Sequence, residues 1–128
     1  MALIIDTALP DAARWAADEL THVLRARGAA GADPSFTIGL ADQSTAVDEA
    51  LCAGAVQCPP EPESLVIQPF APDRIAVAGH DERGLTYALL EVARAIEVAP
   101  TSTPVFDAVL PAVETPHLAW RSLQLAAV

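Results

Sequence analysis

The stretch RIAVAGHDERGL, at residues 74–85, joins a strand pattern directly to a helix start. Its first six residues alternate branched apolar residues with small ones, which is the period of a strand. Asp81 is then placed to cap a helix, and Glu82 lies where the positive helix end favours an acid. Gly84 in the first turn costs about 1 kcal/mol of helix propensity relative to alanine. We infer that this turn lies against a strand too closely for a Cβ atom.

The strand pattern at residues 74–79 is the second half of a hairpin. Residues 64–68 read SLVIQ and supply the first half. Between them, Pro72 presets the backbone for the first central position of a type I turn, and Asp73 suits the second. The larger apolar residues of both strands fall on one face. The other face carries smaller or mixed residues, so we expect that side of the sheet to be less thoroughly covered.

Two long amphipathic helices are predicted at about residues 10–27 and 82–98, because their apolar residues recur at helical spacing. Short strands are predicted at residues 2–5 and 35–40. A short helix is predicted at residues 44–55, beginning with a serine that can cap it. Together these elements predict an α/β (α+β) sandwich, in which a small mixed β-sheet has the two long helices packed on one face.

The sequence changes character after residue 98. Prolines interrupt the chain as far as Pro116, which predicts an extended tail. Residues 118–125 read LAWRSLQL and predict a strand. Because an apolar strand at the chain end needs a partner, we expect the chain to be truncated, as a piece of a longer polypeptide.

Composition narrows the functional class. The 128 residues carry seven Lys and Arg against 17 Asp and Glu, a net charge of −10, and 52% are apolar, so one folded domain is expected. No lysine is present, which argues against nucleic-acid binding. No apolar run is long enough for a membrane span, and no basic leader precedes Asp6. We therefore expect a cytoplasmic location by default, with secretion of a longer parent not excluded.

The sequence contains no specific catalytic motif and predicts no cofactor. Cys52 and Cys58 are spaced as C-x5-C, which matches neither a zinc site nor a C-x-x-C redox motif, so we expect two ordinary reduced thiols. The three histidines, His22, His80 and His117, lie in different predicted elements. No metal site is therefore predicted.

One polar cluster, residues 80–83, is a candidate site made of His80, Asp81, Glu82 and Arg83. It could act as an acid/base or carbohydrate-binding group at a helix N-terminus, where backbone amides also favour anions. The alternative is a capped helix start on a solvated loop, because capping alone accounts for both acids. Three further carboxylates, Asp6, Asp42 and Asp107, follow strand-like segments and could share a sheet edge. Their spacing does not distinguish a glycosidase pair from ordinary turn acids.

Trp120 and Arg121 form a second candidate site. An indole face can stack on a sugar ring, and a guanidinium can donate two hydrogen bonds to neighbouring hydroxyls. The alternative is an interface tryptophan beside a surface arginine.

The part from about residue 64 to residue 125 resembles the end of the non-catalytic N-terminal α/β domain of hexosaminidase-type glycoside hydrolases. The hairpin ending IAVAG at residues 75–79, the helix start DERGLTYALL at 81–90 and the segment ETPHLAWR at 114–121 carry the resemblance. Related domains precede the barrels of α-glucuronidases and other bacterial glycosidases. The chain departs from the usual pattern at Ser122, so the resemblance leaves the specificity of the parent open.

The resemblance implies an accessory α/β domain at residues 1–110. It also implies, at residues 111–128, a linker and the start of the first strand of a missing catalytic barrel. Such a domain would brace a (β/α)8 barrel, with Arg121 reaching the sugar and the catalytic carboxylates on later barrel strands. The chain alone would then have no enzymatic activity.

Two other functions fit the same sequence. A stand-alone module could bind a glycan through residues 80–83 or Trp120. Alternatively, an interaction domain could homodimerise through its C-terminal strand, since an unpaired apolar strand favours pairing with another chain.

Overall fold

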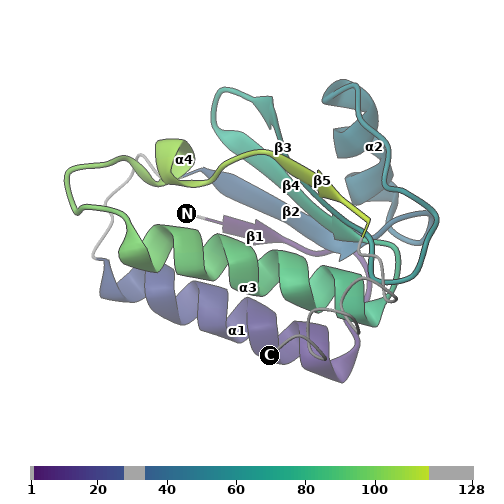
Figure 1. The fold of residues 1–128 in the computed structure, drawn as a ribbon, viewed down its shortest axis with the longest axis horizontal. Helices are drawn as coiled ribbons and strands as arrows, with labels where there is room; N and C mark the ends of the chain where they lie inside the picture. Colours follow the sequence, from purple (N-terminus) through teal and green to yellow (C-terminus); the bar gives the residue numbers. More distant parts are fainter. Residues whose placement is uncertain (1, 28–33, 116–128) are drawn as a thin grey trace, which may run out of the picture.

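The computed structural model describes residues 2–27 and 34–115. Figure 1 shows one mixed sheet with helices on both of its faces. In chain order the elements are β1 (Ala2–Ile4), α1 (Asp11–Ala26), β2 (Ser35–Leu40), α2 (Thr45–Ala53), β3 (Leu65–Ala71), β4 (Arg74–Gly79), α3 (Glu82–Val98), α4 (Val105–Ala108) and β5 (Ala112–Glu114). The predicted α/β class is confirmed, with β2, β4 and α3 starting and ending at the predicted residues. None of the described helices is both long and apolar enough to span a bilayer.

The five strands lie in the order β1-β2-β4-β3-β5. β1, β2 and β4 are parallel, so their carboxyl ends meet at one edge of the sheet. β3 runs antiparallel to β4 as the predicted hairpin, and β5 runs antiparallel to β3. Neither Pro72 nor Asp73 has a positive φ, as a type I turn requires. The loops that enter α1, α2 and α3 therefore all lie at the same edge.

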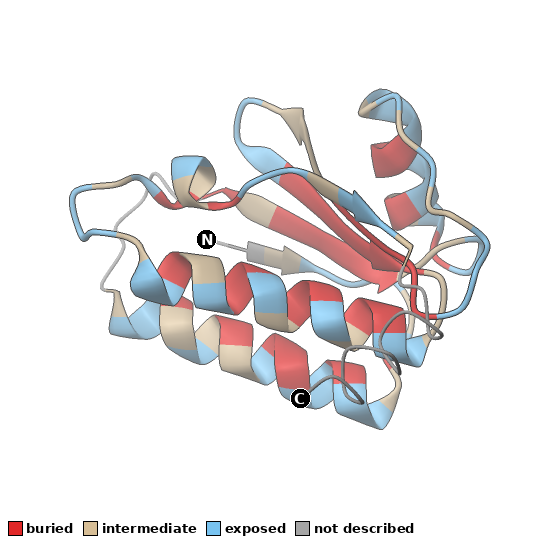
Figure 2. Cartoon of the chain, in the orientation of Figure 1, coloured by how far each residue is buried: buried red, intermediate tan, exposed pale blue. Residues whose placement is uncertain are grey.

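The main core lies between the sheet and the two long helices. α1 and α3 pack side by side on one face, where Figure 2 shows their buried sides turned to the strands. Phe36 and Ile38 of β2 and Ile75 and Val77 of β4 are fully buried beneath these helices. Their alternation places every second residue of each strand in this core.

A smaller core lies on the opposite face of the sheet. There α2 packs its apolar side against the small residues Ala76 and Ala78 of β4 and against Val66 of β3. Ser44 caps α2 as predicted, because its hydroxyl accepts a hydrogen bond from the Val47 amide at 3.2 Å. The expectation that this side would be less thoroughly covered is confirmed, since one short helix covers it.

Close backbone packing joins β4 to α3. A Cβ atom added at Gly84 would lie 2.2 Å from the carbonyl oxygen of Ser64, and one added at Gly79 would lie 2.1 Å from the Leu85 nitrogen. Real Cβ atoms do not approach backbone atoms that closely, so both positions require glycine. The prediction made for Gly84 is confirmed, and Gly79 adds a second contact of the same kind.

The side chain of Arg27, just after α1, closes the far end of α3. Its guanidinium donates to the carbonyl oxygens of Ile96 at 2.9 Å and Pro100 at 2.6 Å, and also to those of Ala99 and Thr103. The last carbonyls of a helix have no partner within the helix, and α3 has no basic residue in its own last turn. Arg27 therefore acts as a C-terminal cap supplied by the neighbouring helix.

The structure differs from the sequence pattern in the tail. The composition after residue 98 predicts an extended chain, yet this stretch contains the single helical turn α4 and the strand β5. β5 lies within residues 111–128, which the resemblance assigns to a linker and the start of a barrel strand, and it pairs with the first three residues of β3. β3 itself continues to Ala71 past an irregularity after Pro69. The strand expected at residues 118–125 lies outside the described residues.

Candidate functional site

The predicted loop at residues 80–83 meets the chain that enters β3, and together they form a polar cluster. We call this the α3 entry cluster: Glu63, Ser64, His80, Asp81 and Arg83. Asp81 holds it together with both carboxylate oxygens. Oδ1 accepts the Gly84 amide proton at 2.8 Å, and Oδ2 accepts the Glu63 amide proton at 3.0 Å.

Asp81 is ionised for a structural reason. Partial burial raises the pKa of its carboxyl, but the hydrogen bonds from the Gly84 and Glu63 amides outweigh this effect, so the pKa lies below its ordinary value of 3.8. Electrostatic interactions with His80 and Arg83 lower the pKa of Asp81 further. Since both oxygens are occupied by backbone amides, this geometry favours the helix-cap interpretation of Asp81 over an acid/base role.

Glu63 belongs to the cluster although the sequence did not single it out. It is buried at 4% exposure and has a positive φ of 63°. Its Oε1 lies 3.4 Å from an Arg83 nitrogen, and the Arg83 side chain is largely exposed. The two residues are 20 positions apart, so no local spacing links them. The only sequence signal is an acid at the end of a proline-rich loop beside a strand.

The other members of the loop do not converge on a reacting centre. His80 is half-buried, and its backbone amide donates to the Ser64 carbonyl at 3.0 Å. Glu82 is exposed in the first turn of α3. Within the described ranges no three His, Cys, Asp or Glu side chains are arranged to hold a metal ion. The cluster fixes the start of α3 and leaves Glu82 and Arg83 in contact with solvent.

The three isolated carboxylates do not share one place. Asp6, just after β1, accepts hydrogen bonds from the Ser44 hydroxyl and from the Ala46 amide at 2.8 Å. These bonds, the one from Ser44 first, hold the pKa of Asp6 below its ordinary value. Asp42 follows β2, so it lies near the same carboxyl ends of the parallel strands as Asp6. Asp107 lies in α4, which precedes β5, and is therefore at the opposite ends of the strands. Asp6 thus supplies the negative charge at the N-terminus of α2.

The two cysteines are not joined by a disulfide. Cys52 is exposed and Cys58 is half-buried. Burial, with a smaller contribution from Asp42 and other nearby acids, raises the pKa of the Cys58 thiol to about 11. Because the thiolate is the reactive form, Cys58 is a poor nucleophile at neutral pH.

Hollows on the described surface include one of about 1020 Å³ beside α2, which is lined by the acids Asp42 and Asp48 and by both cysteines. A second, about 410 Å³, lies at the ends of α1 and α3 near Arg27. A third, about 460 Å³, separates α3 from β5. The second candidate site, Trp120 with Arg121, lies outside the described residues.

Comparison with known proteins finds a similar fold among solved structures. No protein-family model and no curated protein sequence matches the chain. Among solved structures, a GH138 enzyme targeting pectin rhamnogalacturonan II matches with a TM-score of 0.61 and 14% sequence identity. The match covers 91% of this chain and 11% of that chain, and at this identity it shows a shared fold alone. That protein is a glycoside hydrolase, and nothing in the match specifies a hexosaminidase.

Proposed function

We propose that this chain is a non-catalytic accessory domain of a carbohydrate-active glycoside hydrolase and braces a (β/α)8 catalytic barrel. The observation that carries the proposal is the extent of the match. Nearly the whole chain superimposes on a segment that makes up only 11% of a glycoside hydrolase. A unit of that size inside a large enzyme is a domain, and the active site of a barrel enzyme is built by the barrel itself.

The chemistry of the described residues supports the same assignment. The polar groups at the carboxyl edge of the sheet are used to hold the fold: Asp81 caps α3, and Asp6 binds the start of α2. The two carboxylates of a glycosidase both face the sugar from opposite sides of the scissile bond. Asp81 and Asp6 instead face backbone amides, which suits a domain whose role is structural.

The resemblance in residues 114–121 adds one expected contact between this chain and the substrate. By that resemblance, Arg121 reaches the sugar from the beginning of the barrel, with Trp120 beside it. Arg121 would then be the one residue of this chain that touches substrate.

The test compares the 128-residue chain with the complete polypeptide encoded by its gene. The chain alone is expected to show no turnover on a panel of aryl glycosides, whereas the complete polypeptide is expected to hydrolyse one of them. Deleting residues 1–115 from the complete polypeptide is expected to lower the melting temperature of the remainder. Turnover by the chain alone, or a gene product without a barrel, would overturn the proposal. Saturable sugar binding by the chain alone, lost in Trp120→Ala, would favour a stand-alone binding module.

A further inference from the structure

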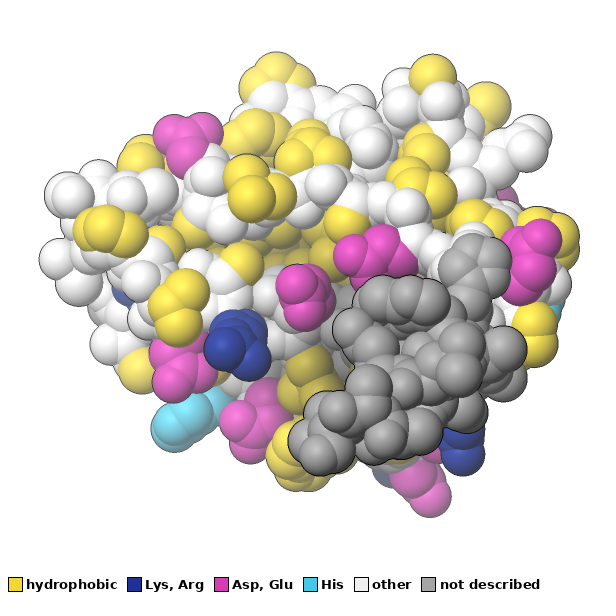
Figure 3. All heavy atoms as spheres, in the orientation of Figure 1, with side chains coloured by type: hydrophobic (Ala, Val, Ile, Leu, Met, Phe, Trp, Pro, Cys, Tyr) yellow, Lys and Arg dark blue, Asp and Glu magenta, His cyan; other side chains and the backbone are white. Residues whose placement is uncertain are grey.

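The hollow between α3 and β5 has the composition of a protein interface. We call it the α3–β5 groove, and its lining residues are Leu65, Tyr87, Leu90, Glu91, Arg94 and Glu114. Figure 3 shows hydrophobic side chains on its floor and charged side chains along its margins. An aromatic residue and an arginine around an apolar centre are the residue types that dominate binding energy at interfaces.

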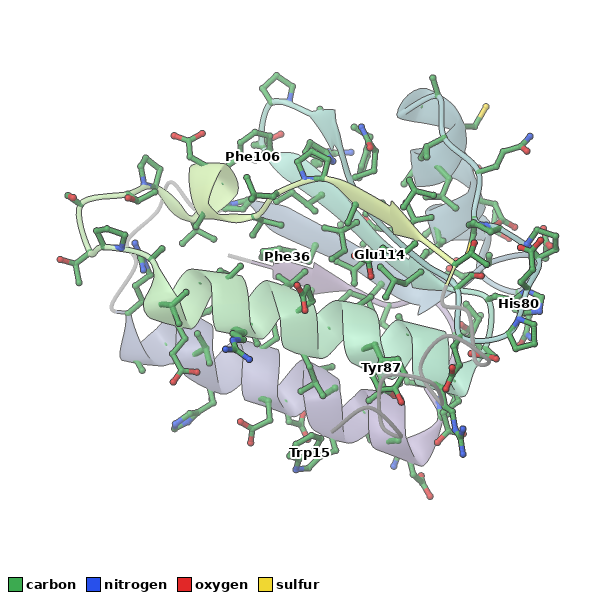
Figure 4. The ribbon with its side chains drawn as sticks, viewed as in Figure 1. Trp15, Phe36, His80, Tyr87, Phe106 and Glu114 are labelled. Atoms are coloured by element: carbon green, nitrogen blue, oxygen red, sulfur yellow. The ribbon has the colours of Figure 1, made fainter. Side chains whose placement is uncertain are left out.

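The groove is open because β5 lies beyond the helical layer. α3 covers β3 and β4, and no described helix covers β5. Leu65 at its floor is paired in register with Glu114, so both side chains point to this face of the sheet. Tyr87 remains 40% exposed on the wall formed by α3, and Figure 4 shows it on the same face as Glu114.

Charges at the groove are available to a partner. Among the described residues, Arg94 has no ion pair or hydrogen bond, and it projects from the exposed side of α3. The hollow beside α2, in contrast, is lined by Asp42 and Asp48 with no cation. The hollow at the ends of α1 and α3 also combines apolar residues with charges of both signs, but its arginine, Arg27, already donates to four carbonyl oxygens. Of these three hollows, the α3–β5 groove is therefore the one that combines apolar surface with an arginine that pairs with no other described residue.

The course of the chain indicates which partner fits. Glu114 lines the groove, and the hydroxyl of Thr115 lies 3.4 Å from that of Ser64 at the adjoining strand. The next strand suggested by the sequence begins at about Leu118. Three residues span at most about 11 Å, so a barrel that begins there must lie against the surface beside Thr115.

We propose that the α3–β5 groove is the docking surface for the catalytic barrel of the same polypeptide. This inference rests on the proposed function and names the surface through which the accessory domain acts. The barrel surface that fits presents an apolar side chain between Tyr87 and Leu65 and a carboxylate to Arg94.

The experiment measures how often the two domains separate in the complete polypeptide. Under a protease that cleaves transiently exposed chain, the cleavage rate at residues 111–128 follows the population of the separated state. Tyr87→Glu and Arg94→Glu are each expected to raise this rate about tenfold, as loss of a central interface contact does. The matched controls are Trp15→Glu and Arg25→Glu on the outer side of α1, where Trp15 is 56% exposed, and both are expected to leave the rate unchanged.

A second measurement separates docking from folding. In the 128-residue chain alone, all four variants are expected to keep the melting temperature of the parent sequence, since the substituted residues are exposed. If Tyr87→Glu lowers the melting temperature, the cleavage rate of Arg94→Glu alone tests the docking surface. Equal cleavage rates for the groove variants and the parent, or an effect confined to the controls, would overturn the docking surface while the accessory-domain proposal stands. A gene product with no barrel would overturn the proposed function and this inference with it.

Discussion

At the scale of single residues, the fold depends on a few side chains that act far from their own element. Arg27 caps α3 from the end of α1, and Asp81 fixes both the start of α3 and the amide of Glu63. Gly84 and Gly79 act through the absence of a side chain. These positions carry polar or steric constraints that no substitution of similar hydropathy satisfies.

Gly84→Ala is expected to destabilise the chain by about 3 kcal/mol, because the new methyl group would lie 2.2 Å from the Ser64 carbonyl oxygen and force α3 away from β3. The free energy of unfolding in urea measures this. Gly54→Ala is the control: its Cβ would meet the side chain of Gln68, which can move, at 2.9 Å. Equal losses from both variants would show that close packing at Gly84 is not the cause.

Arg27→Ala is expected to lower the free energy of unfolding by about 2 kcal/mol, since four carbonyl oxygens lose a charged donor. Arg27→Lys is expected to recover less than half of this, because an ammonium cannot match the planar fork of a guanidinium. Arg25→Ala, two residues earlier and exposed, should stay within about 0.5 kcal/mol of the parent. Full recovery by lysine would mean that charge alone is sufficient.

At the scale of elements, the helix starts are tied to the sheet by carboxylates. Asp6 lies at the end of β1 and binds the first turn of α2, while Asp81 lies between β4 and α3. Both act in the ionised form, which links the packing of two helices to pH.

The lowered pKa of Asp81 predicts how the free energy of unfolding changes at acidic pH. Its pKa is lowered in the folded chain, so the unfolded chain binds the proton more readily. The stabilisation is therefore complete well above pH 3.8 and is lost as the pH falls through the lowered pKa. In Asp81→Asn, an amide nitrogen faces a backbone N–H, so we expect the free energy of unfolding at pH 7 to fall by about 1 kcal/mol. We also expect the free energy of unfolding to decline less steeply between about pH 7 and pH 3 than in the parent sequence. Urea unfolding across this range measures both; an unchanged acid slope would contradict the assignment.

The sequence could predict the long elements because their periodicity is local. The residue ranges of β2, β4 and α3 follow from alternation and helical spacing together with their caps. α4 and β5 are only four and three residues long and depend on tertiary pairing, so the proline-rich composition around them predicted an extended tail. Within the candidate site, the cap at Asp81 was predictable from four adjacent residues. The burial of Glu63 was not predictable, because Glu63 bonds to Asp81 and Arg83, which lie 18 and 20 positions away.

At the scale of the whole molecule, the two faces of the sheet are unequally supported. Among the described residues, twenty buried residues form the core under α1 and α3, and six form the core under α2. Both cores share the sheet, so the larger one holds the strands together whether or not α2 is in place. α2 is therefore expected to be the least stable unit of the described fold.

α2 and α3 are expected to differ in local stability because their cores differ in size. Separating α2 from the sheet exposes chiefly Val47, Ala50 and Leu51, whereas separating α3 exposes the centre of the main core. The amides of α2 are therefore expected to exchange with solvent through a partial opening whose free energy is at least about 2 kcal/mol below that of the α3 amides. Hydrogen exchange at low urea concentrations measures both. Val47→Ala should lower protection in α2 alone, because its partners lie in the smaller core, while Leu89→Ala should lower protection throughout. Equal protection of α2 and α3 in the parent sequence would show instead that the sheet transmits stability evenly between its two faces.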